Sequence, residues 1–237
     1  GLRTQRRRII LLKVDLHMHS HFSPDSMMSP ERLVRRCEQV GLNCIAVTDH
    51  NTTAGALRAR ELAQFHVIIG EEVRSSEGEI TGLFLDESIP AGLTPVETAR
   101  RIKDQGGLVS VPHPFDRFRR SVITTRGLEE VWPHADIIEV FNARNNLDAD
   151  NRKAREFAAA HDLIGSAVTD AHTVVELGRT YIEMPEFDGT PGGFKDALSQ
   201  GALHTRKMTP LIHVATRFTV LYKKLFGAPP SQPNEAK

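Results

Sequence analysis

The sequence has little of what marks secreted or membrane-spanning proteins. Its 237 residues include only two cysteines, Cys37 and Cys44. Two thiols are too few for a disulfide framework and fit a reducing cytoplasm better. No run approaches the roughly eighteen apolar residues of a membrane span, and the N-terminus shows no signal peptide. We therefore expect a cytoplasmic protein without a membrane partner.

An excess of charge of one sign is also missing. The 30 basic and 30 acidic residues cancel to a formal net charge of zero. Nucleic acid is therefore not expected as the main partner, because a strongly basic chain would be needed to attract it. Four arginines near the N-terminus form a small basic arm, which we interpret as a solvated terminus: Arg3, Arg6, Arg7 and Arg8.

Several common catalytic motifs are absent as well. The sequence contains neither a P-loop nor a Gly-x-Gly-x-x-Gly motif, and no Ser-His-Asp or Cys-based arrangement stands out. What it does contain is an apolar stretch that runs into Asp15, His17 and His19. In an extended strand these side chains share one face. Two imidazoles with a carboxylate behind them suit a divalent metal, whereas the alternative is a chance pair on a surface strand.

The hydrophobic pattern alternates between strands and helices. After the opening strand, strands are expected at 44–48, 67–73, 80–85, 108–111, 136–141, 163–169 and 181–184. Helices are expected at 30–40, 54–64, 95–105, 147–160, 190–200 and 211–226. Such alternation predicts an α/β fold with parallel strands. We expect one domain over residues 9–205, an amphipathic helix within 206–227 that packs on or extends it, and a disordered tail at 228–237.

Histidine and carboxylate side chains stand where successive strands end. In a barrel of parallel strands these ends meet at one face, so distant residues would converge there. With an aspartate from the loop after the first strand, the candidate metal ligands are His17, His19, Asp25, His50, Glu72, His113, Asp170 and His172. Imidazole and carboxylate ligands suit zinc, manganese or iron. Two or three bridged ions are typical of phosphoester hydrolysis, in which bound hydroxide attacks the phosphorus.

Six motifs stand in an order that resembles the PHP (polymerase and histidinol phosphatase) family of metal-dependent phosphoesterases. They occupy residues 15–20, 23–25, 47–51, 70–73, 113–114 and 169–172, and the resemblance spans roughly residues 13–185. It implies a distorted (β/α)7 barrel of mostly parallel strands, here with a C-terminal helical extension. It also implies metal-dependent phosphoesterase activity.

The resemblance further implies how the ligands are shared. His17, His19, Glu72 and Asp170 would hold one ion. Glu72 would bridge to a second ion held by His113, and a third would be held by Asp25, His50 and His172. Many members carry another histidine between His113 and Asp170, and this sequence offers no clear match. Asn142 is a candidate weak ligand or substrate contact in that region, whereas Glu139 would face the other way in an ideal strand.

Other candidates concern catalysis, orientation and substrate binding. We assign catalytic roles to His113, Asp170 and His172, with the two histidines as candidates for proton transfer. The carboxylates before two ligand histidines either orient imidazoles or cap strand ends; they are Asp15 and Asp49. Three arginines follow strand ends or ligands, where a guanidinium can clamp phosphate, and we expect one of them to do so: Arg117, Arg144 and Arg179.

The sequence thus predicts a metal-dependent phosphoesterase for a small phosphorylated substrate, with a nucleotide or nucleoside bisphosphate as the first candidate. One rival is an amidohydrolase-like enzyme, which commonly bridges two metals with a lysine; no lysine ends a predicted strand. The other is a non-catalytic PHP module, which would be marked by lost ligands. The oligomeric state stays open.

Overall fold

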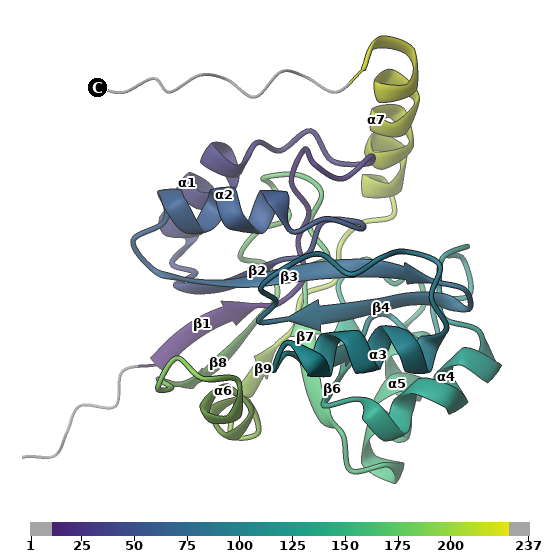
Figure 1. The fold of residues 1–237 in the computed structure, drawn as a ribbon. Helices are drawn as coiled ribbons and strands as arrows, with labels where there is room; N and C mark the ends of the chain where they lie inside the picture. Colours follow the sequence, from purple (N-terminus) through teal and green to yellow (C-terminus); the bar gives the residue numbers. More distant parts are fainter. Residues whose placement is uncertain (1–10, 228–237) are drawn as a thin grey trace, which may run out of the picture.

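In the computed structural model, which describes residues 11–227, the strands form one continuous sheet (Figure 1). Its spatial order is β7-β6-β5-β4-β3-β2-β1-β8-β9. The strands are β1 (Leu11–Asp15), β2 (Cys44–Val47), β3 (His66–Ser75), β4 (Gly78–Leu83), β5 (Leu108–Val111), β6 (Ile137–Asn142), β7 (Ile164–Val168), β8 (Tyr181–Pro185) and β9 (Ala202–His204). Neighbouring strands pair in parallel from β1 to β3 and from β5 to β7. Strand β4 runs antiparallel to both of its neighbours.

The sheet curls until the chain beyond β1 meets the chain beyond β7. Met18 forms a parallel bridge with Ala171, and the His19 backbone N–H donates to the Ala171 carbonyl at 2.8 Å. This seam nearly closes the barrel. The prediction of a distorted barrel of mostly parallel strands is therefore confirmed, with β4 as its antiparallel member and β8 pairing antiparallel with β1.

Helices follow most strands and lie outside the sheet (Figure 1). They are α1 (Pro30–Val40), α2 (Ala54–Leu62), α3 (Pro95–Asp104), α4 (Thr125–Val131), α5 (Asp148–Ala160), α6 (Pro191–Leu198) and α7 (Ile212–Phe226), with a 3-10 turn, η1, at Trp132–His134. Ser29 caps α1 by accepting from the Arg32 N–H, and Thr94 caps α3 by accepting from the Glu97 N–H. The sequence pattern missed α4 and β9, because seven- and three-residue elements show too little periodicity.

Alternation along the strands divides the core into two parts. Ile45 and Val47 of β2 pack with the buried faces of the outer helices, among them Leu33 of α1. Cys44 and Ala46 of the same strand join the second cluster, which groups residues of the other strands with α6. A strand buried on both faces explains why residues 44–47 are all apolar.

Some expectations fall outside the part of the chain that the structure describes. These are the basic arm at residues 3–8 and the tail at 228–237. Between residues 11 and 227, no helix has the length and apolar character needed to span a bilayer.

Candidate metal centre

The eight predicted ligands, which come from six stretches of chain, converge at the C-terminal end of the parallel strands. Their nitrogen and oxygen atoms fall into overlapping groups in which all atoms lie within 4.8 Å of one another. The groups are His19 with Asp25, His50 and His172; His17 with His113 and Asp170; His17 with His19 and Glu72; and His50 with Glu72 and Glu79. Such an arrangement fits more than one cation.

Around the first implied ion, donors meet from three strands. The Nε2 atoms of His17 and His19 lie 3.0 Å apart. Glu72 Oε2 lies 3.4 Å from the former and 3.5 Å from the latter, and Asp170 Oδ1 lies 3.6 and 3.4 Å from them. Neither of these carboxylate oxygens has a hydrogen-bond partner among residues 11–227. Buried oxygens without partners are costly unless a cation meets them, so this donor set fits a divalent metal.

The third implied ion has its donors nearer the surface. Asp25 Oδ2 lies 3.0 Å from His172 Nε2 and 3.3 Å from His50 Nε2, and the other Asp25 oxygen has no partner among the described residues. The rings of His172 and His50 both contact the His19 ring, with centroids 4.3 and 4.6 Å from it. These donors also fit a cation.

The residues implied for the second ion are His113 and Glu72, and the sequence offers no clear match for the further histidine that many members carry. His113 Nε2 lies 2.9 Å from Glu72 Oε1. A carboxylate that the sequence analysis did not single out, Glu79 of β4, stands beside them and is only 4% exposed. The strand-end pattern could not indicate it, because Glu79 begins a strand.

Glu139 corrects one expectation. Its carboxylate lies inside the cluster, with Oε1 2.6 Å from His17 Nδ1 and Oε2 accepting from the His113 N–H at 2.8 Å. The expectation that it faces away was wrong because the register of β6 shifts between Glu139 and Phe141. Such a bulge re-aims side chains. Glu139 is thus the carboxylate that orients His17, a partner that ligand imidazoles usually have.

The two carboxylates proposed as orienting groups act differently. Asp49 accepts from the Ser23 hydroxyl, which also lies 3.0 Å from His19 Nδ1, so Asp49 reaches an imidazole through a serine. Gly55 makes room for it, because a Cβ there would lie 1.9 Å from Asp49 Oδ2. Asp15 instead accepts from the Thr169 hydroxyl and N–H across the barrel seam.

Two ligands hold uncommon backbone conformations. His113 has φ 29° and Asp170 has φ 53°, in the left-handed region that residues other than glycine rarely adopt. Such strain persists where the surrounding structure enforces it, and it clusters at functional sites. Each residue stands two positions after the last residue of an apolar strand, and the sharp turn of the chain there directs its side chain toward the cluster.

Charges in the centre compensate one another. Burial raises the pKa of Asp170, but Arg119 and His17 hold it well below its usual range. Burial lowers the pKa of His50, but Glu72 and Asp25 raise it to about 10. Burial and the neighbouring His172 lower the pKa of His19 to about 3. The neighbouring carboxylates therefore favour the protonated form of His50, and a metal ion that binds this imidazole would displace its proton.

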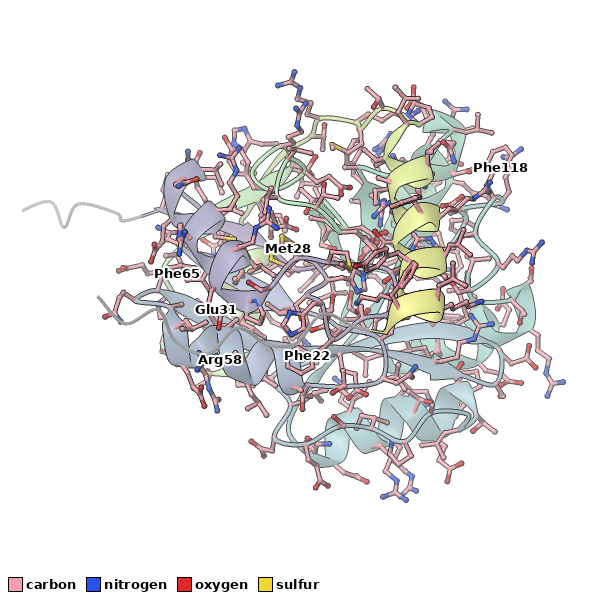
Figure 2. The ribbon with its side chains drawn as sticks, turned by 90° about the horizontal axis from the view of Figure 1, so that it is seen from above. Phe22, Met28, Glu31, Arg58, Phe65 and Phe118 are labelled. Atoms are coloured by element: carbon pink, nitrogen blue, oxygen red, sulfur yellow. The ribbon has the colours of Figure 1, made fainter. Side chains whose placement is uncertain are left out.

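A cavity of about 490 Å³ opens beside the cluster. Asp25, His50, Glu79 and His172 are among the residues that line it, and the others include Arg119, Arg144, Arg217, His213, Thr216 and Phe118. Helix α7 supplies three of these. Seen from above, it crosses the molecule between Phe22 and Phe118 (Figure 2). The lining of the cavity thus combines candidate metal ligands with cationic side chains, and two of these, Arg119 and Arg144, contact Asp170 or His172.

The three predicted arginines lie in different places. Arg144 is 3% exposed, lines the cavity, and donates to the Asp170 carbonyl and to Thr216. Arg117 turns to Asp150, and Arg179 donates to the Val175 carbonyl; neither lines the cavity. Arg119, which pairs with Asp170, was missed because the loop around it has no periodic pattern.

Asn142 lies in the cluster. Its amide nitrogen donates to Glu139 Oε2 at 2.9 Å and to Asp170 Oδ2 at 3.2 Å. These bonds make it a support for two carboxylates, and its side chain is fully buried.

Helix α7 has an unusual orientation. Its polar side contacts the barrel: Lys223 Nζ donates to the carbonyls of His21 and Ser23 at 2.7 and 2.6 Å, and His213 Nε2 lies 3.1 Å from the Arg144 carbonyl. Several of its apolar side chains are exposed, among them Val214, Phe218, Leu221 and Leu225, as is Leu211 at its N-cap. The helix therefore packs against the ligand loop and the cavity through polar contacts.

Comparisons with known proteins agree with this architecture. The model of the PHP domain family matches residues 15–88, and a PHP-associated model matches residues 148–203. An uncharacterized protein of Methanocaldococcus jannaschii, MJ1587, is 38% identical over 145 residues, which cover 56% of this chain and 82% of that protein.

Two more distant likenesses are informative. A 5'-3' exoribonuclease of Haemophilus influenzae is 33% identical over 100 residues, which cover 39% of this chain and only 36% of that enzyme. The structure of a two-domain protein from Bacteroides vulgatus, containing a predicted PHP-like metal-dependent phosphoesterase, superposes with a TM-score of 0.65 at 21% identity. It covers 84% of this chain and 69% of that one. With the family match, the ordered motifs and the barrel in agreement, the chain belongs to the PHP family.

Proposed function

We propose that this protein hydrolyses phosphoric esters with the help of divalent metal ions, and that its substrate is a small phosphorylated molecule. The observation that carries the proposal is the cavity whose lining combines candidate metal ligands with Arg119, Arg144 and Arg217. A phosphoryl group needs both cations that neutralise its oxygens and a positioned water.

The donor set fits two or three ions of zinc, manganese or iron, because it combines imidazoles with carboxylates that lack other partners. Bound ions would neutralise phosphoryl charge and acidify a water near neutral pH. His17, His19, Glu72 and Asp170 would hold the first. His113 with Glu72 would hold the second, and Asp25, His50 and His172 the third.

The chain's own cations would position the substrate. The Arg144 guanidinium is fixed between Thr216, the Asp170 carbonyl and His172. Because its rotamer is already restricted, it can bind a phosphate oxygen at little further entropic cost. Arg217 and His213 approach from α7. Together these groups would orient a phosphate toward the ligand cluster.

We assign proton transfer to His172 or His113. His172 lines the cavity and His113 is fully buried against Glu72. A histidine that holds a metal ion is a poor free acid, so a water in the site would supply the proton whenever both histidines act as ligands. We also place Asp170 at the reacting centre, because its Oδ1 atom has no hydrogen-bond partner among the described residues and could bind a metal ion there.

The size of the cavity favours a small substrate such as a nucleotide. A volume of about 490 Å³ lies within the range of small-molecule pockets. Phe118 lines it with a side chain that is 62% exposed, so its ring is available to stack on a base. The exoribonuclease relative makes a nucleic-acid end the alternative substrate.

An amidohydrolase-like activity is disfavoured, because the lysine that commonly bridges two metals in those enzymes is absent from the residues that line the cavity. The non-catalytic rival is disfavoured because every ligand that the sequence indicated lies in the cluster.

The test is phosphate release from metal-free protein reloaded separately with manganese, zinc or iron. The panel should include nucleoside monophosphates, nucleoside bisphosphates, a cyclic phosphodiester, a 5'-labelled oligoribonucleotide and an amide series. Asp170→Asn is the disabled variant, and Asp136→Asn, at the opposite end of the barrel, is its matched control. Metal-dependent turnover of an ester that only Asp170→Asn abolishes supports the proposal. Turnover of amides alone, or metal binding with no turnover at all, overturns it.

A further inference from the structure

We propose that Glu79 is a metal ligand of this chain, occupying the place of the histidine that the family pattern leads one to expect elsewhere. It would complete a set with Glu72 and His113. This assignment rests on the proposed metal centre, but not on the identity of the reaction.

The topology explains how Glu79 reaches the cluster. Parallel strands deliver side chains where they end, but β4 is antiparallel and so begins at the same edge of the barrel. In the β3–β4 hairpin Glu72 pairs with Thr81, and Arg74 pairs with Glu79. Residues at paired positions, and those two apart along a strand, share one face. Glu72 and Glu79 therefore project from the same face of one hairpin.

The Glu79 carboxylate lies close to two imidazoles without forming a hydrogen bond to either of them. Its Oε1 atom lies 3.6 Å from His50 Nδ1, and its Oε2 atom lies 3.7 Å from His113 Nε2. Both distances are too long for hydrogen bonds. Oε2 has no hydrogen-bond partner among the described residues although the residue is 4% exposed. A cation between Glu79, Glu72 and the imidazoles would satisfy these atoms.

An ordinary structural role does not account for this burial. The guanidinium nearest to Glu79 belongs to Arg74, at 4.0 Å from Oε1, and its side chain is 47% exposed. A solvated ion pair at that distance contributes little stability. Glu71, the next carboxylate along β3, accepts from the Ile89 N–H at 2.9 Å through Oε2. Its Oε1 atom also lacks a partner among the described residues, but unlike Glu79 it belongs to none of the donor groups.

The identity of the donors has a consequence for the metal. Two carboxylates and one imidazole form a harder set than the imidazole-rich ligands of the other two ions. We therefore expect the position at Glu79 to prefer manganese over zinc more than the rest of the centre does.

The experiment compares full-length wild type, Glu79→Gln, Glu79→His and the matched control Glu71→Gln. Each metal-free protein is dialysed against manganese and then against zinc, and bound metal is counted by elemental analysis. Manganese electron paramagnetic resonance reports spin coupling between bridged ions. Circular dichroism verifies that each variant is folded.

We expect Glu79→Gln to bind one manganese ion fewer, or to bind it at least about tenfold more weakly, with loss of the coupled spectrum. Glu79→His should restore the count and shift its preference toward zinc, and Glu71→Gln should match wild type. Equal manganese count, affinity and coupling in Glu79→Gln and wild type would overturn the assignment. Wild type that binds metal in this way but hydrolyses no ester would defeat only the proposed function.

Discussion

The two ends of the barrel treat buried charge in opposite ways. At the N-terminal end of the strands, Asp136 accepts from Lys103, Lys195 and the Val109 N–H, and neither of its oxygens is left over. At the C-terminal end, Asp25, Glu72, Glu79 and Asp170 each keep an oxygen without a partner among residues 11–227. Charge is satisfied at one end and left open at the other.

The difference shows which buried charges hold the fold and which await a ligand. Asp136 joins α3, α6 and the chain just before β6, so its ion pairs link structural elements. The open oxygens of Glu72, Asp170 and Glu79 lie 3.4, 3.4 and 3.7 Å from an imidazole nitrogen. Satisfied groups indicate stability, and unsatisfied oxygens that lie beside imidazoles indicate a ligand site, which agrees with the division of roles between the two ends of β/α barrels.

The largest expected effect comes from Asp170→Asn. This change removes one negative charge from the ligands of the first implied ion. It should lower metal-dependent phosphate release by at least about a hundredfold, because the amide is a poor metal ligand and cannot neutralise the charge of Arg119. The measurement is turnover at saturating metal beside thermal melting. A variant that keeps wild-type turnover would show that the open oxygens at this end are not functional.

Glu139→Gln should act on metal affinity. The carboxylate orients His17, and losing such a partner typically costs about 10–100-fold in metal affinity. Competition with a chelating dye gives the affinity. Asp15→Asn is the control, since Asp15 bonds Thr169 and no imidazole. An equal loss of affinity in both variants would contradict the role given to Glu139.

Asp136→Asn should destabilise the protein by about 1–2 kcal/mol and leave metal binding unchanged. Burial raises the pKa of Asp136, but Lys103 and Lys195 lower it below the ordinary 3.8. Its stabilising effect is therefore present above that value and is lost as the pH falls through the lower, folded-state pKa. Urea unfolding of both proteins between pH 7 and 3 should show the gap between them closing only at the acidic limit. A gap independent of pH would break the contrast between the two ends.

Phe118→Ala should have the smallest effect. If the ring stacks on a base, KM for a nucleotide should rise about fivefold to tenfold, as a stacking energy near 1 kcal/mol implies, with kcat unchanged. KM for an ester without a base, such as glycerol phosphate, should not move. A parallel rise for both esters would remove the argument for a nucleotide.

The sequence was informative where chemistry coincides with regular structure. His17, His50, His113 and Asp170 could be predicted because each stands just beyond the end of an apolar strand, and Glu72 because it follows the apolar part of β3. Parallel strands bring these positions together at one face. The barrel itself follows from the same alternation of strands and helices.

The missed residues share a departure from that regularity. Glu79 starts an antiparallel strand, Glu139 precedes a register shift, and Arg119 lies in an irregular loop. Strand direction, bulges and loop paths depend on tertiary pairing and leave no period in the sequence. Of the three predicted arginines, only Arg144 reaches the cavity, because exposed loop side chains have no pattern that fixes their direction.

The seam between Met18 and Ala171 links metal binding at the candidate centre to the closure of the barrel. His17 and His19 flank one side of this bridge, and Asp170 and His172 flank the other. An ion bound by residues from both segments would hold the two segments together at the seam, where the strands of the barrel are least connected. Anything that binds the folded state alone raises its stability. Metal loss should therefore loosen the wall of the barrel at this line first, with faster amide exchange at residues 17–19 and 169–172 than in β2 or β3.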